Sequence, residues 1–214
     1  MQIVFAHFYS RLPRHLVLNL KRTVSLFPEH KVCLITDQDS NQIHIPDLQI
    51  IKYNPSPNWY TIERNLSHPA DFRNNFWFTS LARIYALCDY VASNNVPILH
   101  IESDVLIAHD LPIDRFQMCD RPIAYTVVGK GSGVASVMWI QNSQAAFHLR
   151  DYASKSAQKD PTSTDMKILG RYQEEFPQRV RALASFSIEN ARSYNSLSPQ
   201  IVEDFTYTEN LFEG

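Results

Sequence analysis

The feature that most constrains the fold is an alternation of short apolar runs with segments of helical spacing over residues 1–107. The apolar runs are rich in β-branched residues and lie at residues 3–8, 31–36 and 48–53. Between the first two runs, apolar residues recur every four positions, at Leu12, Leu16, Leu20 and Val24. Such runs are typical of buried strands, and the four-residue repeat is typical of a helix. This alternation predicts an α/β domain with a mostly parallel sheet.

The rest of the chain extends this pattern. The best helical stripe runs from Trp77 to Ala92, with Asn74 or Asn75 as its cap. Further strands are expected at residues 97–107 and 134–140, and further helices at residues 143–157 and 164–176, the last capped by Thr164. Residues 59–75 are polar and aromatic without a clear period, which predicts a long loop with room for a short helix.

The length of 214 residues indicates one domain, which we place at residues 1–192. Hydrophobic residues make up 44% of the chain and charged residues 20%, which are globular values. Residues 193–214 contain acidic side chains but no Lys or Arg, and we expect them to form a peripheral tail.

Charge and cysteine content exclude several classes of protein. The formal charge of -2 provides no basic surplus for a broad nucleic-acid surface. No apolar run reaches the roughly 18 residues that span a bilayer, and the N-terminus lacks the features of a signal peptide. Three widely spaced cysteines do not form a disulfide framework, and we expect Cys33 and Cys88 to be buried thiols. These features predict a cytoplasmic protein.

The most informative residues are Glu102 and Asp104, which interrupt the apolar stretch from Pro97 to Ile107. Residues two apart on a strand point to the same face, so we expect both carboxylates to project together. No Lys or Arg lies between His100 and Arg115 to neutralise them. A hard cation, Mg²⁺ or Mn²⁺, is the natural partner of such a pair at the carboxyl end of a strand. The alternative is that the two acids begin a solvent-exposed loop.

The order strand, Glu-Ser-Asp, apolar run resembles the D-x-D motif of nucleotide-sugar glycosyltransferases with the glycosyltransferase-A (GT-A) fold. The helix from Trp77 to Ala92 is similar to the one that precedes this motif and presents a basic residue to the nucleotide. The segment from Gly131 to Asn142 looks like the family's small-residue strand, and Thr164 to Gly170 resembles the helix start whose acidic residue faces the acceptor and the transferred sugar. As an order of elements the resemblance spans residues 1–176, and around residues 98–107 it is specific.

The resemblance implies a single Rossmann-like domain with a mostly parallel central sheet and helices on both faces. It implies a divalent cation, Mn²⁺ or Mg²⁺, as cofactor, and a nucleotide-sugar donor and a hydroxyl acceptor as partners. The residues it assigns are Glu102 and Asp104 for the metal, Arg83, Gly131 and Gly133 for the donor, and Asp165 for catalysis. Many members add a late histidine to the metal, whereas the last histidine here is His148.

From the residues alone, each of these assignments has an alternative. Arg83 also fits a solvated helix surface, and Asp165 also fits a favourable charge at a helix start. The glycines at positions 129, 131 and 133 also fit a flexible loop.

Four further residues are candidates for donor binding. His7 and Tyr9 end the first strand, and Asp37 ends the second, where a carboxylate can accept from a ribose or a base. The ordinary alternatives are a core or surface aromatic for Tyr9 and a turn residue for Asp37. Trp59 lies in the long loop, and we expect it to stack on a ligand, because Trp77 fits the apolar stripe instead.

These observations predict a metal-dependent glycosyltransferase. Nucleotidyl transfer is a second reading, although the loop after the first strand contains Arg11 and Arg14 without glycine. A catalytically degenerate module that binds a nucleotide sugar or a protein is a third. A metal-dependent nuclease is disfavoured because no E-x-K element follows Glu102.

Overall fold

The computed structural model describes residues 1–8, 11–38, 43–55, 57–68 and 75–183. Its strands are β1 (Gln2–His7), β2 (Lys31–Thr36), β3 (Leu48–Lys52), β4 (Ile98–Ile101), β5 (Ile123–Val127), β6 (Gly133–Ile140) and β7 (Val180–Leu183). Its helices are α1 (Arg14–Leu26), α2 (Pro57–Asn65), α3 (Phe76–Asn94), α4 (Ser143–Lys159) and α5 (Asp165–Glu175), with a 3-10 helix η2 (Ile113–Met118) before β5. Tyr9 and the expected tail at residues 193–214 lie outside the described residues.

The strands form one mixed sheet in the order β3-β2-β1-β4-β6-β5-β7. β1 is parallel to β2 and β4, and β2 is parallel to β3. β6 is antiparallel to both of its neighbours, β4 and β5, and β7 returns parallel to β5. The expected α/β class with a mostly parallel sheet is therefore confirmed, and every strand except β6 ends at the same edge, called here the carboxyl edge.

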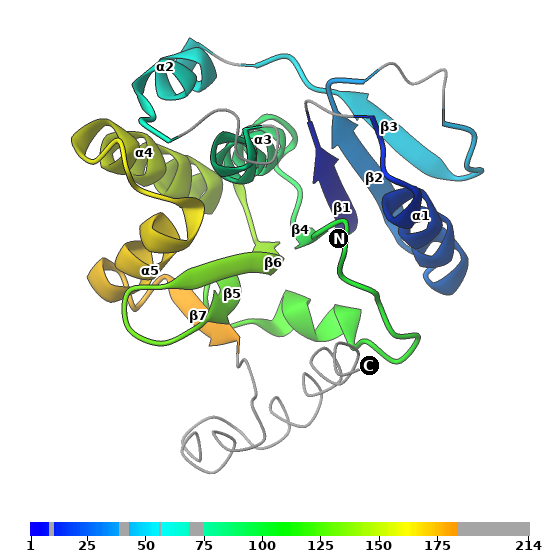
Figure 1. The fold of residues 1–214 in the computed structure, drawn as a ribbon. Helices are drawn as coiled ribbons and strands as arrows, with labels where there is room; N and C mark the ends of the chain where they lie inside the picture. The colour runs from blue at the N-terminus through cyan, green and yellow to red at the C-terminus, as the bar shows by residue number, and fades with distance from the viewer. Residues whose placement is uncertain (9–10, 39–42, 56, 69–74, 184–214) are drawn as a thin grey trace.

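Helices cover both faces of the sheet, with α2 to α5 on one face and α1 and η2 on the other (Figure 1). Successive strand residues point to opposite faces. In β1, Val4 and Ala6 therefore pack in the core beneath α2 to α5, whereas Ile3 and Phe5 pack beneath α1 and η2. Cys33 and Cys88 are buried in the first of these cores, as expected.

Several expected elements differ from the structure. The expected strand at residues 97–107 ends at Ile101, because the polar residues after it leave the sheet in a turn. Asn75 precedes α3, but its side chain accepts no capping hydrogen bond. Its backbone is left-handed, with φ 65°, whereas side-chain capping needs an extended backbone. Thr164 caps α5 as expected, since its hydroxyl accepts from the Lys167 N–H.

Candidate active site

The two acids lie in a turn directly after β4. Within this turn, the Val105 N–H donates to the Glu102 carbonyl at 3.2 Å, and the Glu102 N–H donates to the Ser136 carbonyl of β6 at 2.9 Å. Glu102 is half-buried and Asp104 is exposed. The expectation that both carboxylates share one face of a strand is therefore wrong. They are still close enough for the charge of Asp104 to raise the pKa of Glu102.

Arg83 of α3 forms an ion pair with Glu102. Their side chains are only 16% and 19% exposed, so this is not the solvated surface arginine of the alternative reading. α3 joins two parallel strands and runs back across the sheet, which brings its first turns to the carboxyl edge. The cation that is missing between His100 and Arg115 is thus supplied by a helix that precedes the acids in the chain.

Asp165 is the first residue of α5 and is 7% exposed. Burial raises the pKa of its carboxyl, whereas Arg83 and the N–H groups of Met166 and of Asp165 itself oppose the rise. The charge of Asp165 in turn raises the pKa of Glu102. The structure therefore brings together Arg83, Glu102 and Asp165 from three separate elements at the carboxyl edge.

The electrostatic balance of this cluster is negative. Burial raises the pKa of Glu102 most; Asp104 and Asp165 raise it further, and Arg83 opposes them. Among the described residues, the charges of Asp104 and Asp165 therefore act on Glu102 against the charge of Arg83. His100 of β4 adds no charge, because burial and the nearby Arg83 lower its pKa to about 3. Its Nδ1–H donates to the Val4 carbonyl at 2.9 Å, so the imidazole is neutral. Sequence reasoning missed this residue, although a histidine within an apolar strand is a signal for it.

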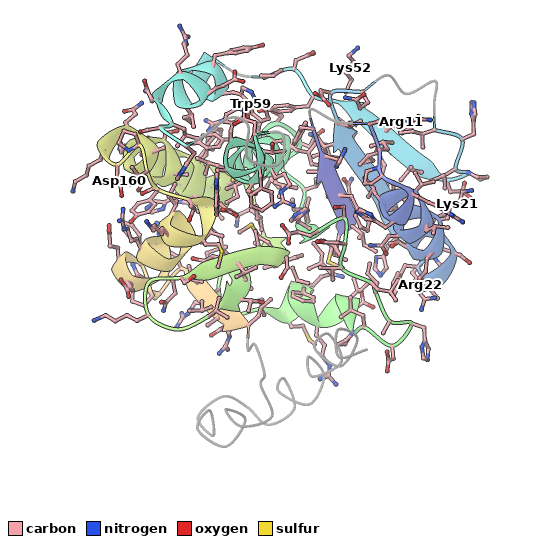
Figure 2. All side chains as sticks on the ribbon, in the orientation of Figure 1. Arg11, Lys21, Arg22, Lys52, Trp59 and Asp160 are labelled. Atoms are coloured by element: carbon pink, nitrogen blue, oxygen red, sulfur yellow. The ribbon has the colours of Figure 1, made fainter. Side chains whose placement is uncertain are left out.

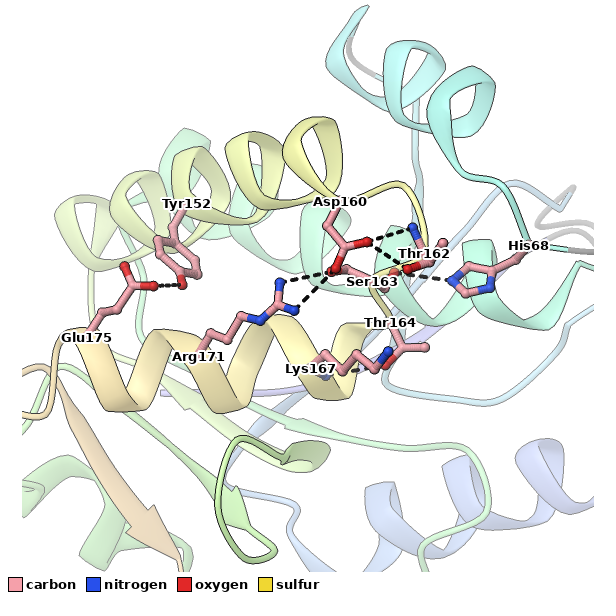
Figure 3. Close-up of polar contacts among 9 residues, drawn as sticks. All are labelled: His68, Tyr152, Asp160, Thr162, Ser163, Thr164, Lys167, Arg171 and Glu175. Atoms are coloured by element: carbon pink, nitrogen blue, oxygen red, sulfur yellow. Dashed lines mark hydrogen bonds and ion pairs between the residues drawn. The ribbon is translucent and has the colours of Figure 1, made fainter.

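A polar network fixes the loop that leads to Asp165 (Figure 3). The Asp160 carboxylate accepts from the Thr162 N–H at 3.1 Å, from the Ser163 hydroxyl at 2.8 Å and from Arg171 of α5 at 3.2 Å. These donors hold the pKa of Asp160 well below its usual range. His68 contacts the Ser163 carbonyl at 3.3 Å from the segment after α2. The loop before α5 is thus bound both to α5, through Arg171, and to the segment after α2, through His68.

Trp59 was expected to stack on a ligand, and this expectation is wrong. Its side chain is 2% exposed and packs against the rings of Phe8, Tyr53 and Phe78 beside α3 (Figure 2). A ring buried on all sides presents no face to a sugar. Trp77, which was expected in the core, is instead half-buried.

The glycines form the β5–β6 turn, in which the Val128 N–H donates to the Ser132 carbonyl at 2.9 Å. Gly131 has φ +70° and its backbone packs directly on Gly170 of α5. A Cβ at Gly133 would lie 2.8 Å from the Leu169 Cβ. The close backbone approach that Gly131 and Gly133 permit is therefore to α5, and this packing accounts for both glycines without a ligand.

The remaining candidates lie at the carboxyl edge. His7 ends β1, where it pairs with Thr36, and Asp37 follows β2. Both side chains are half-buried, and the Gln38 side chain donates to Asp37 at 3.0 Å. Their expected contacts with a nucleotide stay predictions.

Two other features bear on ligand binding. No cluster of three or more His, Cys, Asp or Glu side chains is placed to hold a metal ion within the described residues. A cavity of about 440 Å³ lies between the end of α1 and η2, lined in part by His30, His109 and Asp114. It lies beside the start of β2, away from the carboxyl edge.

None of the described helices is long and apolar enough to cross a membrane.

Comparison by sequence finds no matching family model and no matching curated protein. Comparison by structure finds many similar chains. The galactosyltransferase LgtC, solved in complex with donor and acceptor sugar analogs, has a TM-score of 0.60 and 16% identity over 95% of this chain and 82% of that one. The PaToxG glycosyltransferase has a TM-score of 0.56 and 9% identity over 82% and 69%. Mouse xyloside xylosyltransferase 1, in its apo form, has a TM-score of 0.53 and 9% identity over 95% and 92%.

These three structures share the fold at very low sequence identity. The chain therefore has the GT-A-like glycosyltransferase fold that its motifs resemble.

Proposed function

We propose that this chain is a glycosyltransferase that transfers a sugar from a nucleotide-diphosphate sugar to a hydroxyl acceptor. The observation that carries the proposal is the meeting of Arg83, Glu102 and Asp165 at the carboxyl edge of a sheet with this fold. Ligands of open α/β sheets bind beyond this edge. LgtC, which has the same fold, was solved with donor and acceptor sugar analogs.

The chemistry of the acidic cluster fits a divalent cation. Burial raises the pKa of Glu102, Arg83 opposes this rise, and the nearby charges of Asp104 and Asp165 add to it. A divalent cation beside these carboxylates would favour their charged forms. Glu102 and Asp104 would hold Mn²⁺ or Mg²⁺, and oxygen atoms of the donor diphosphate would complete the ligand set. When bound, the cation supplies Lewis-acid stabilisation of the charge on the departing diphosphate.

The chain's own residues have separate roles in this proposal. Arg83 holds Glu102 in place and favours the charged form of Asp165, since its cation opposes the pKa rise of both carboxyls. Asp165 would present its carboxyl group to the acceptor hydroxyl or to the transferred sugar. His7 and Asp37, at the ends of β1 and β2, bind the nucleotide.

The second candidate is a binding module that retains the nucleotide sugar without transferring it. The Arg83–Glu102 ion pair favours this candidate, because it neutralises one of the two carboxylates proposed to bind the metal. The two candidates predict the same ligand and differ in turnover alone.

Thermal shift with UDP, GDP and CDP sugars, with and without Mn²⁺, tests the proposal. A ligand that binds the folded state raises Tm according to its concentration relative to Kd. We expect one sugar nucleotide to protect in the presence of Mn²⁺ only, and Asp104→Asn to abolish this protection while leaving the unliganded Tm unchanged. Asp110→Asn, a change to another exposed aspartate, is the matched control. Protection by no sugar nucleotide would contradict the proposal, and protection without release of nucleotide diphosphate would favour the binding module.

A further inference from the structure

Asn19 is a buried polar residue on the apolar face of α1. Its side chain is 4% exposed, on the helix face formed with Leu16, Leu20 and Thr23. An amide at such a position loses its contact with water on folding and needs hydrogen-bond partners within the protein.

The partners of Asn19 lie in the acidic turn. Its Nδ2 group donates to the Val105 carbonyl at 2.6 Å and approaches the Ser103 carbonyl at 3.4 Å. Ser103 and Val105 are the two residues on either side of Asp104. One side chain from a helix more than 80 positions earlier thus spans the backbone that carries the carboxylate.

Arg22, one helical turn further along α1, extends this contact (Figure 2). Its Nε–H donates to the Ile107 carbonyl at 3.0 Å. The Thr23 hydroxyl donates to the Asn19 carbonyl at 2.8 Å and ties the helix locally at the same place. The outer side chains of the turn, those of Asp104 and Leu106, are exposed, so α1 holds the turn through its backbone carbonyls.

The stability that Asn19 contributes does not explain this arrangement. Among the described residues, its Oδ1 atom is buried without a hydrogen-bond partner. Leaving such an acceptor unpaired costs about as much as one hydrogen bond contributes, roughly 1 kcal/mol or more. A leucine of similar volume would fill the space without that cost. Unlike a leucine, the Asn19 amide fixes the path of the backbone on both sides of Asp104.

We propose that Asn19 is a positioning residue that sets the place of Asp104, and through it the affinity for the metal and the nucleotide. This inference rests on the proposed function for its consequence, whereas the hold on the turn stands on the hydrogen bonds alone. Outer partners that orient a metal ligand typically change metal affinity by 10–100-fold.

Two variants separate the contributions. Asn19→Leu removes the donor at similar volume, and Asn19→Asp replaces the donor by an acceptor that faces two carbonyl oxygens. Asn94→Leu is the matched control, because the Asn94 side chain also donates to a backbone carbonyl, that of Tyr90 at 2.8 Å, at the far end of α3. Circular dichroism and Tm establish that each variant is folded.

Two readouts then decide the inference. Hydrogen exchange of the peptide covering residues 102–107 should be roughly fivefold faster in Asn19→Leu, as expected for the loss of one net hydrogen bond. Mn²⁺ affinity, measured by electron paramagnetic resonance with the diphosphate (UDP, GDP or CDP) of the sugar nucleotide that protects the unmodified chain, should fall by about tenfold or more in both variants. Asn94→Leu should change neither quantity.

Each outcome supports or overturns the inference. Unchanged hydrogen exchange overturns the inference that Asn19 stabilises the backbone of the turn. Faster exchange with unchanged Mn²⁺ affinity overturns the positioning role and leaves a structural contact. If no nucleotide and Mn²⁺ bind to the unmodified chain, the proposed function has failed and the positioning role fails with it, which distinguishes this outcome from a failure confined to the variants.

Discussion

Replacement of Arg83 by methionine tests the electrostatic argument for the site. Arg83→Met keeps an unbranched apolar stem but removes the guanidinium that pairs with Glu102 and opposes the pKa rise of Asp165. Breaking a fully buried pair costs about 3–5 kcal/mol, because the remaining charge is left without compensation. The two side chains here are 16% and 19% exposed, so we expect about 2–3 kcal/mol near pH 8. For a chain of this length, this corresponds to a decrease in Tm of about 4–12 °C.

The pH dependence gives this prediction its sign. Burial already raises the pKa of Glu102 and of Asp165, and without Arg83 both values rise further. A carboxyl with a raised pKa in the folded state binds its proton more tightly there than in the unfolded chain, so stability falls as the pH rises through that range. The Tm difference between Arg83→Met and the unmodified chain should therefore be small near pH 5 and should grow toward pH 8.

A second substitution shows whether the cost comes from the charge. Glu102→Gln in the Arg83→Met background removes the carboxylate that has lost its ion-pair partner and should restore much of the lost Tm at pH 8. Arg64→Met, at an exposed arginine of α2, is the control and should leave Tm nearly unchanged. An equal loss of Tm at pH 5 and pH 8, together with no rescue by Glu102→Gln, would refute the electrostatic account.

Three further predictions follow from packing and from the loop before α5. Asp160→Asn should lower Tm at pH 7, and the difference should begin to shrink as the pH falls below about 4, the range of the unfolded carboxyl, and be lost as the pH falls through the depressed folded-state pKa. A constant difference in Tm measured down to pH 3 would show that the charge of Asp160 is unimportant. Gly170→Ala should lower the free energy of unfolding in urea by about 3 kcal/mol or more, since the added Cβ meets the Gly131 backbone, which cannot move aside as a side chain does. Trp59→Ala should cost about 3–5 kcal/mol in the same assay, as expected for a core aromatic, and a cost below 1 kcal/mol would contradict its burial.

Local pattern was sufficient for elements that are buried on both faces or have a clear cap. The second strand matches the expected residues 31–36, because a parallel strand covered on both sides is a continuous apolar run. Thr164 identified the start of α5 in the same way, because its hydroxyl accepts from a backbone N–H three residues later.

The elements that sequence reasoning missed depend on neighbours distant in the chain. β7 has only four residues, one of them Arg181, and it exists because β5 is beside it in the sheet. Local hydrophobicity gives no sign of such a pairing.

In the candidate site, too, some features are local in the sequence and others are not. Glu102, Asp104 and Asp165 were chosen as candidates from their types, their places in the chain and the family resemblance, but the turn after Ile101 and the ion pair with Arg83 required the packing of α3 on the sheet. Trp59 was misplaced because an aromatic residue in a polar segment does not reveal which side of the segment faces the core. Asn19 carried a local signal, a polar residue on an apolar helical stripe, that was not used.

The antiparallel β6 has a consequence for how the chain folds while it is being synthesised. In the described sheet, β6 lies between β4, which borders the half built from β1 to β3, and the half that contains β5 and β7. During translation, β1 to β4 can assemble while residues 133–140 are still within the ribosome. Until they emerge, β4, with four buried residues, is an uncovered hydrophobic border that other nascent chains can pair with. Strand-by-strand growth along this sheet thus halts at its centre and resumes once the hairpin of β5 and β6 has been released.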